Sequence, residues 1–273
     1  MTPADETGRL IAEAERFLAS LPDLTRPIIH RYFRTALDVE SKADNSPVTR
    51  ADRDVEIAVR AALSEQFPHH AIIGEEQGGQ ADSRFCWVID PIDGTRAFVI
   101  GKPTFGTLVA FCIDGVAVAS VIDMPQLDEC YLSWEGGAVL QTSTSRTPLH
   151  SSQCQNISDA HIATTSPEAF SAQGLNQFNA VVRACLSSHY GGDCYNYALL
   201  AAGHIDIVME HQLALHDIMA LLPVLTGSGA TISDWQGQPV THSTDGSLLA
   251  SATPELHAGA LELIARTASS ADV

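Results

Sequence analysis

The N-terminal part of the chain repeats apolar positions with the period of an α-helix. Apolar residues recur three or four positions apart over residues 10–21, which predicts an amphipathic helix. A second helix is predicted after Pro27. A third is predicted from Asp52 onward, where the helical period returns, and Thr49 followed by Asp52 three positions later resembles a helix-capping signal. Two or three helices are therefore expected to open the fold.

Short apolar runs then predict β-structure. The runs at 71–74 and 85–90 are followed by two longer runs that flank an Asp-Gly pair at 114–115, a strong hairpin signal. A second hairpin is predicted around the Glu-Gly-Gly turn at 135–137. Together these signals predict an antiparallel sheet over about residues 70–142.

A polar stretch rich in Ser and Thr, residues 142–153, separates this region from one of different character. It is the predicted boundary between an N-terminal α+β lobe, residues 1–145, and a C-terminal α/β lobe, residues 146–273. In the second lobe, strands alternate with helical stretches that end at glycine. The elements predicted there are strands at 161–164 and 205–210, a helix closed by Gly203, and a helix from Asp217 closed by Gly227 or Gly229. The last ten residues or so are expected to fray.

The charge balance argues against several partners. The 273 residues include 33 acidic and 15 basic side chains, for a net charge of −18, which disfavours extended contact with nucleic acid or an anionic membrane. No apolar run is long enough to span a membrane and the N-terminus has no signal-peptide pattern, so a cytoplasmic protein is expected. The six cysteines lack metal-binding spacing and are expected to be reduced thiols.

The strongest chemical signal is the Asp-Pro-Ile-Asp-Gly-Thr segment at 90–95. A strand delivers Asp90 at its end, the proline bends the chain, and Asp93 points back into the same space. Two converging carboxylates are costly unless a cation neutralises them, and such oxygen ligands suit Mg²⁺ or Mn²⁺. The backbone N–H groups of Gly94 and Thr95 can hold phosphate oxygens. The alternative is a tight turn in which the Asp side chains only cap the backbone.

Further carboxylates extend this signal, each with a simpler alternative. Glu75 follows an apolar run, and both it and Glu76 can be solvated loop charges. Asp217 and Asp52 each stand near a helix start, where Asp is a good cap. Their order along the chain, Glu, then Asp-x-x-Asp-Gly-Thr, then Asp, favours a metal site. An acidic protein that binds phosphate esters also needs local positive charge, which divalent metals supply.

These residues resemble the motifs of the inositol monophosphatase superfamily, a group of Mg²⁺-dependent, typically lithium-sensitive phosphatases. The similarity includes Gly74-Glu75-Glu76, the 90–95 segment, and Asp217, which corresponds to the Asp of the family's W-D-x-A-A segment. It extends over most of the chain, from the capping signal at 49–52 to the Asp-Trp-Gln-Gly segment at 234–237. One departure is His216, where the family usually has Trp. We interpret it as a change in packing beside the metals.

The resemblance implies a layered α-β-α-β-α sandwich, an α/β (α+β) fold with its site between the lobes. Glu75, Asp90 and the Ile92 carbonyl would hold one Mg²⁺. Asp90, Asp93 and Asp217 would hold a second, so that Asp90 bridges, and two or three ions are expected per site. Homodimers are common in the family, which makes a homodimer the assembly to test.

The resemblance also implies how hydrolysis would proceed. A metal-activated water would be oriented by Glu75 and the Thr95 hydroxyl, with Asp52 positioning Thr95. The N–H groups of Gly94 and Thr95 would hold the phosphate, and no covalent intermediate is needed.

Segments 93–107 and 191–203 look like the histidinol-phosphate phosphatase branch of the superfamily. This implies hydrolysis of histidinol phosphate to histidinol and phosphate, a step of histidine biosynthesis. The substrate carries an amine and an imidazole, so its site should present anionic or hydrogen-bond-accepting groups. Asp193, Glu210 and Asn196 are the candidate substrate contacts. Helix capping is the alternative for Asp193.

Two other functions stay open from the sequence. One is hydrolysis of an inositol phosphate, or another sugar or nucleotide phosphate, on the same fold. The other is a non-catalytic regulatory or binding protein that kept the fold. Phosphate release from a panel of these esters, with and without EDTA, separates the three.

Overall fold

The computed structural model describes residues 3–36, 39–41, 47–80, 83–241 and 244–269. The helices are α1 (Pro3–Tyr32), α2 (Arg50–Gln66), α3 (Thr95–Val99), α4 (Ala172–Ala184), α5 (Cys194–Ala201), α6 (Leu215–Met219), α7 (Leu221–Gly227) and α8 (Pro254–Ser269). The first large sheet contains β3 (Ala71–Gly74), β4 (Phe85–Asp93), β5 (Gly106–Ile113), β6 (Val116–Met124), β7 (Glu129–Trp134), β8 (Gly137–Gln141) and β9 (Arg146–Pro148). The second contains β10 (His161–Thr164), β11 (Ser187–Tyr190), β12 (Ile207–Glu210), β13 (Thr231–Ser233) and β14 (Leu248–Ser251), while β1 (Val39–Ser41) and β2 (Pro47–Thr49) form a separate pair.

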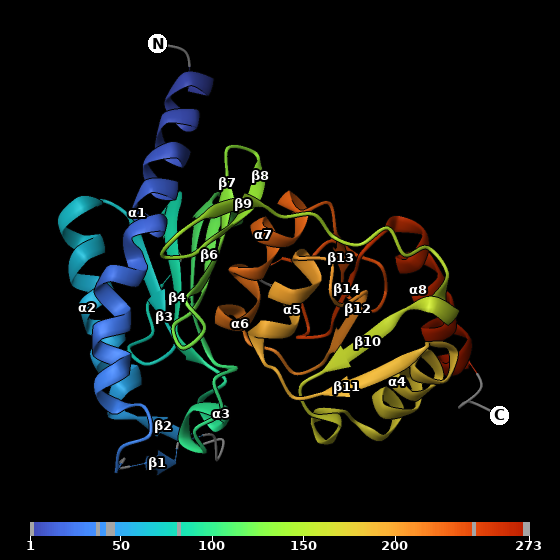
Figure 1. The fold of residues 1–273 in the computed structure, drawn as a ribbon. Helices are drawn as coiled ribbons and strands as arrows, with labels where there is room; N and C mark the ends of the chain where they lie inside the picture. Colours follow the sequence, from blue (N-terminus) through green and yellow to red (C-terminus); the bar gives the residue numbers. More distant parts are fainter. Residues whose placement is uncertain (1–2, 37–38, 42–46, 81–82, 242–243, 270–273) are drawn as a thin grey trace.

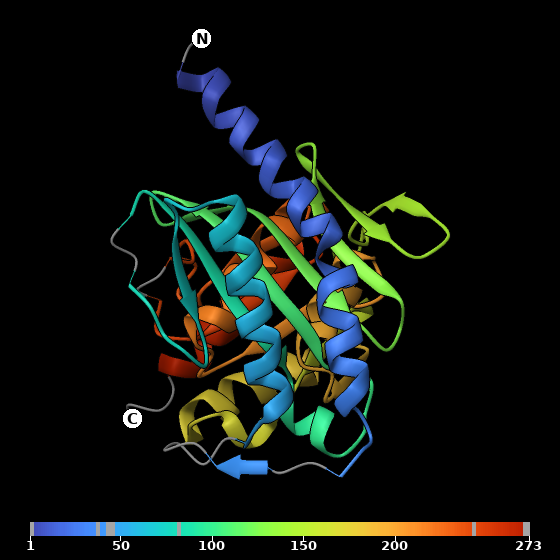
Figure 2. The same cartoon turned by 90° about the vertical axis from the view of Figure 1, so that its left-hand side faces the viewer.

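Helices and sheets alternate across the molecule (Figure 1). Helices α1 and α2 lie side by side on the outer face of the first sheet (Figure 2). Helices α5, α6 and α7 fill the space between the two sheets, and α4 and α8 cover the far face of the second sheet. This order is the α-β-α-β-α sandwich that the resemblance to the inositol monophosphatase superfamily implied. The central helical layer brings α5 and α6 close to the end of β4, where the candidate site lies.

The first helix is continuous through two prolines. Pro22 and Pro27 both lie inside α1, so the prediction of a separate helix after Pro27 is wrong. Each proline removes a backbone hydrogen bond at a cost of about 3 kcal/mol. The apolar face of the helix compensates, because Leu18, Leu21 and Ile29 are almost completely buried. Burial of each such side chain contributes about 1.5–3 kcal/mol, a tertiary term that the local pattern does not contain.

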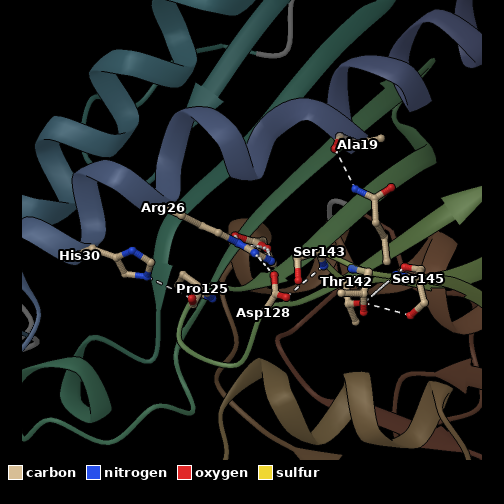
Figure 3. Close-up of polar contacts among 11 residues, drawn as sticks. Ala19, Arg26, His30, Pro125, Asp128, Thr142, Ser143 and Ser145 are labelled. Carbon is tan, nitrogen blue, oxygen red and sulfur yellow. Dashed lines mark hydrogen bonds and ion pairs between the residues drawn. The ribbon is translucent and has the colours of Figure 1, made fainter.

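Arg26 attaches this helix to the first sheet (Figure 3). Its guanidinium donates to Oδ1 of Asp123 at 2.7 Å and to Oδ1 of Asp128 at 2.5 Å. The Asp123 side chain is fully buried, and Asp128 also accepts the Ser143 N–H at 3.0 Å. One turn further along α1, Nε2 of His30 lies 3.1 Å from the Pro125 carbonyl oxygen. A buried carboxylate is thus paired, which avoids the large cost of an isolated buried charge.

The first sheet is mostly, but not entirely, antiparallel. Strands β3 and β4 run parallel, whereas each later neighbour pair is antiparallel. The prediction of a wholly antiparallel sheet was wrong for the first pair, because apolar runs do not encode strand direction. Both predicted hairpins are present, as β5–β6 and β7–β8. The sheet continues into β9, just past the predicted lobe boundary at 145/146, and that boundary stays a prediction.

The second sheet has the strand order β11-β10-β12-β14-β13. The predicted strands at 161–164 and 205–210 appear as β10 and β12. The predicted helix from Asp217 is instead two short helices, α6 and α7, and α6 begins two residues earlier at Leu215. The predicted fraying tail is wrong up to Ser269, because these residues belong to α8 and Ile264 is buried. Residues 270–273 lie outside the described part.

Two further expectations concern the whole chain. All six cysteines are free thiols, as predicted. Among the described residues, no helix combines the length and the apolar character that a membrane span requires.

Candidate metal and phosphate site

A bulge at the end of β4 sets the directions of Asp90 and Asp93. Residues 90–93 of β4 face residues 106–108 of β5, so the two strands fall out of register there. Pro91 has no N–H for the ladder, and its carbonyl accepts the Thr107 hydroxyl at 2.9 Å. In a regular strand, residues three apart point to opposite faces. The irregularity instead places carboxyl oxygens of Asp90 and Asp93 in one cluster.

The predicted metal-ligating carboxylates converge. One carboxyl oxygen each from Asp90, Asp93 and Asp217 lie within 4.8 Å of one another. Asp90 and Glu75 form a second group with a ring nitrogen of His216, within the same distance limit. Asp90 belongs to both groups, which is the placement that a bridging ligand needs. These carboxylates come from β4, the segment after β3, and α6, which are distant in sequence and joined by the fold.

Burial and mutual repulsion act on the cluster together. Burial raises the pKa of Asp90 well above its ordinary value, and the charges of Glu75, Asp93 and Asp217 raise it further. Burial likewise raises the pKa of Asp93, with Asp193 and Asp217 adding to the effect. Carboxyl groups in this state bind protons or cations to relieve the repulsion. Hard carboxylate oxygens in such a group fit Mg²⁺.

Asp217 combines the two roles that the sequence left open. It is the third residue of α6, and its Oδ2 accepts the Ala214 N–H at 2.7 Å, so it caps the helix from within the first turn. Its other oxygen, Oδ1, lies 3.7 Å from Nε2 of His216. Capping by one oxygen therefore leaves the second oxygen in the cluster.

Asp52 also combines capping with a contact in the site. One oxygen, Oδ2, accepts the backbone N–H of Thr49 at 2.8 Å and its hydroxyl at 2.6 Å, which completes the capping box of α2. The other, Oδ1, lies 3.3 Å from the Thr95 hydroxyl, which also donates to the Ile92 carbonyl at 3.0 Å. Burial raises the pKa of Asp52 to about 6. The predicted connection from Asp52 to Thr95 is thus present in the structure.

Gly94 has to be a glycine where it stands. It precedes α3 with φ of 80°, in the left-handed region, and a Cβ there would lie 2.8 Å from Cγ of Asp193. Asp193 itself has φ of 50° and makes no capping hydrogen bond to α5, so the capping alternative is not realised. Burial raises its pKa to about 6, while the charges of Lys102 and Arg96 act in the opposite direction.

A cleft of about 280 Å³ opens over these residues. Its lining includes the metal-cluster residues Glu75, Asp93 and Asp217, together with Asp193, Glu210 and Tyr197. Glu210 is 4% exposed, and its carboxylate accepts the Thr165 N–H at 2.6 Å and the Thr164 hydroxyl at 3.1 Å. Burial raises the pKa of Glu210 to about 7. The cleft is therefore lined by carboxyl groups of the metal cluster and by two more, those of Asp193 and Glu210.

Asn196 is placed differently from the other predicted substrate contacts. It is 4% exposed, it does not line the cleft among the described residues, and its Nδ2 donates to the Gly191 carbonyl at 3.0 Å. A side chain on Gly192 would collide with the Asn196 amide. Asn196 thus supports the loop that carries Asp193. Its predicted contact with substrate stays a prediction, and its side chain does not line the cleft in the described part of the chain.

Three residues of the site were missed by the sequence reasoning or assigned another role. Glu56 is fully buried and accepts the N–H groups of Glu76 at 2.7 Å and Gln77 at 3.1 Å, so it supports the segment that carries Glu75. The Tyr197 hydroxyl is buried in the cleft wall without a hydrogen-bond partner in the described part. The sequence offered one signal for Tyr197. It stands four residues after Asp193 in a helical stretch, and residues four apart lie on the same face of a helix. His216 was interpreted as a packing change, yet its imidazole faces Glu75 at 3.8 Å.

The comparisons with known proteins agree with this geometry. The sequence profile described as the inositol monophosphatase family matches residues 17–269. The chain belongs to the inositol monophosphatase family. It is 38% identical over 253 residues to a bifunctional phosphatase IMPL2 of Arabidopsis thaliana, covering 90% of this chain and 72% of that protein. It is 34% identical to a histidinol-phosphatase of Streptomyces coelicolor, covering 78% and 83%. A solved inositol monophosphatase from Zymomonas mobilis superposes with a TM-score of 0.82 at 36% identity, covering 97% and 100%.

Membership of the inositol monophosphatase family makes the protein a hydrolase of the metal-dependent phosphatase type that acts on small phosphate esters. Dependence on Mg²⁺ is general in this family, and the acidic cluster supplies groups that can bind such an ion.

Proposed function

We propose that the protein hydrolyses histidinol phosphate to histidinol and phosphate. The observation that carries this proposal is a pair of carboxyl groups, Asp193 and Glu210, that line the cleft but belong to neither group of metal-ligating side chains. An ammonium or imidazolium group brought between them would favour their ionised forms and bind to them. The histidinol-phosphatase among the similar proteins supports the same choice.

The donor set fits the magnesium ions that the family implies. Glu75, Asp90 and the Ile92 carbonyl would hold one ion, and Asp90, Asp93 and Asp217 the second. When bound, Mg²⁺ would polarise the phosphate and neutralise the charge that develops during hydrolysis.

The protein's own groups position the nucleophile and the phosphate. The Thr95 hydroxyl directs its proton toward Asp52 and the Ile92 carbonyl, so its lone pairs are left to accept a hydrogen bond from the attacking water. Glu75 lines the same cleft as Thr95 and would orient the water from a second direction. The N–H groups of Gly94 and Thr95, at the start of α3, would hold the phosphate oxygens.

The test of substrate choice is Asp193→Asn, which keeps the size of the side chain and removes its charge. The Michaelis constant for histidinol phosphate should rise at least about tenfold, because a charge-assisted contact contributes about 1.5–3 kcal/mol. Hydrolysis of an aryl phosphate, which lacks the amine, should change far less. Asp159→Asn, at an exposed acid outside the cleft lining, is the matched control. Equal losses on both esters would remove Asp193 from the substrate site.

Inositol phosphate is the second candidate, because the buried Glu210 carboxylate can accept hydroxyl groups as well as cationic groups. Wild-type preference for inositol phosphate over histidinol phosphate in the same assay would favour it. Retention of full activity after complete removal of metal would contradict both candidates.

A further inference from the structure

His216 presents a nitrogen donor to the carboxylate cluster. It precedes Asp217 in the first turn of α6, and its side chain is 23% exposed. Its Nε2 lies 3.8 Å from Oε1 of Glu75 and 3.7 Å from Oδ1 of Asp217. Both distances are too long for hydrogen bonds, so the imidazole faces the carboxylates without binding them directly.

These distances suit an ion placed between the groups. A metal ion binds nitrogen or oxygen ligands at about 2.0–2.1 Å, so two ligand atoms of one ion lie at most about 4.2 Å apart. The separation of His216 from Glu75 falls inside that limit. A ring nitrogen of His216 and one oxygen each of Glu75 and Asp90 also lie within 4.8 Å of one another.

We propose that His216 adds a nitrogen donor to the metal position of Glu75 and Asp90, and so raises its affinity for a first-row transition ion such as Mn²⁺ relative to Mg²⁺. This inference rests on the proposed function, since it concerns the first of the two metal positions assigned there. Imidazole is a poor partner for Mg²⁺, which prefers oxygen, and a good one for transition ions. The second position, with Asp90, Asp93 and Asp217, keeps an all-carboxylate donor set that suits Mg²⁺.

The fold gives His216 a fixed direction toward this position. Asp217 caps α6 through the Ala214 N–H, and the next residues, Ile218 and Met219, are buried between the sheets. The first turn of the helix is therefore held at both ends. A ligand on a rigid element loses little freedom when the ion binds.

Pulsed electron paramagnetic resonance of bound Mn²⁺ tests the assignment directly. The full-length protein, freed of metal and reloaded with Mn²⁺, should show the ¹⁴N coupling of a directly bound imidazole. His216→Phe, which keeps a ring but has no donor, should lose that coupling. His211→Phe is the matched control, because His211 also lines the cleft but stands outside the carboxylate group.

Calorimetric titration gives a second readout that does not depend on turnover. The ratio of Mn²⁺ to Mg²⁺ affinity should fall at least tenfold in His216→Phe and stay within threefold of wild type in His211→Phe. Circular dichroism of the metal-free variants establishes that each is folded. His216→Trp, which restores the residue usual in the family, should behave as His216→Phe does.

The outcomes separate this inference from the proposed function. A ¹⁴N coupling present in wild type and lost in His216→Phe supports the nitrogen donor even if no phosphate ester is hydrolysed. Hydrolysis with Mg²⁺ but no ¹⁴N coupling in wild type overturns it, and the imidazole is then only a charge partner of the carboxylates. A coupling that persists in His216→Phe overturns it as well.

Discussion

At the scale of single residues, several carboxylates in this site contact two partners at once. Asp52 and Asp217 each use one oxygen to cap a helix and direct the other toward the cluster or toward Thr95. Capping and function are therefore not alternatives at these positions. The local requirement for a cap fixes the rotation of the carboxylate, and this rotation places the second oxygen.

Asp217→Asn separates the two roles of this side chain. The Asn amide oxygen can still accept the Ala214 N–H, so melting of the metal-free protein should be unchanged or slightly higher, because one repelling charge is gone. Activity should fall at least about 100-fold, since loss of an outer-shell partner alone costs about 10–100-fold. Steady-state kinetics and thermal melts measure the two effects. An unfolded variant whose folded fraction is fully active would restrict Asp217 to capping.

Thr95→Ala removes the hydroxyl and keeps the backbone N–H that is proposed to hold phosphate. We expect kcat to fall about 100-fold, as for loss of one oriented hydrogen-bonding group in a transition state. The Michaelis constant should change much less. Thr95→Ser, which restores the hydroxyl, should recover most of the rate. Unchanged turnover in the Ala variant would remove Thr95 from the catalytic residues.

At the scale of elements, α2 supports the site from behind. Glu56 on α2 is held by Arg60 at 2.7 Å and accepts two backbone N–H groups from the segment that follows β3. Gly74 lies against the same carboxylate, and a side chain there would collide with it. The direction of Glu75 thus depends on a helix that is not adjacent to it in sequence.

Glu56→Ala should weaken metal binding more than it slows catalysis. The segment carrying Glu75 loses its anchor, so the Mg²⁺ concentration for half-maximal activity should rise about 10–100-fold, as for other outer-shell changes. The rate at saturating Mg²⁺ should largely recover. Titration of activity with Mg²⁺ measures both quantities, and Glu65→Ala, at an exposed position on the same helix, is the control. An unchanged Mg²⁺ requirement would show that Glu56 does not position Glu75.

At the scale of the whole molecule, the charge of the site opposes folding when metal is absent. Burial holds the pKa of Asp52 at about 6 and that of Glu210 at about 7, and it also raises the pKa of Asp90 and Asp93. For a carboxyl group whose pKa is higher in the folded than in the unfolded state, the folded state binds more protons. Stability is then greatest at low pH and is lost as pH rises through the folded pKa.

The metal-free protein should therefore melt at a lower temperature at pH 7.5 than at pH 5. A difference of about 4 °C or more is expected. Each kcal/mol lost from the free energy of unfolding lowers the melting temperature by roughly 2–4 °C in a protein of this size. Added Mg²⁺ should raise the melting temperature more at pH 7.5 than at pH 5. At pH 7.5 the carboxylates are ionised and bind the ion, whereas at pH 5 protons compete with it for the same oxygens. Calorimetry in matched buffers measures this. A metal-free protein that is more stable at pH 7.5 would contradict the buried, mutually repelling carboxylates.

The sequence by itself determined the leading helices and the hairpins of the first sheet, because hydrophobic period and turn residues are local properties of the chain. The layered fold class and the choice of Glu75 and Asp217 as partners of the 90–95 motif came from the resemblance of these motifs to those of the inositol monophosphatase superfamily. The tertiary structure alone decided the parallel pairing of β3 with β4, the continuity of α1 through Pro27, the support from Glu56 and the approach of His216 to Glu75. These depend on burial and on contacts between segments far apart in the chain, which a local pattern does not record.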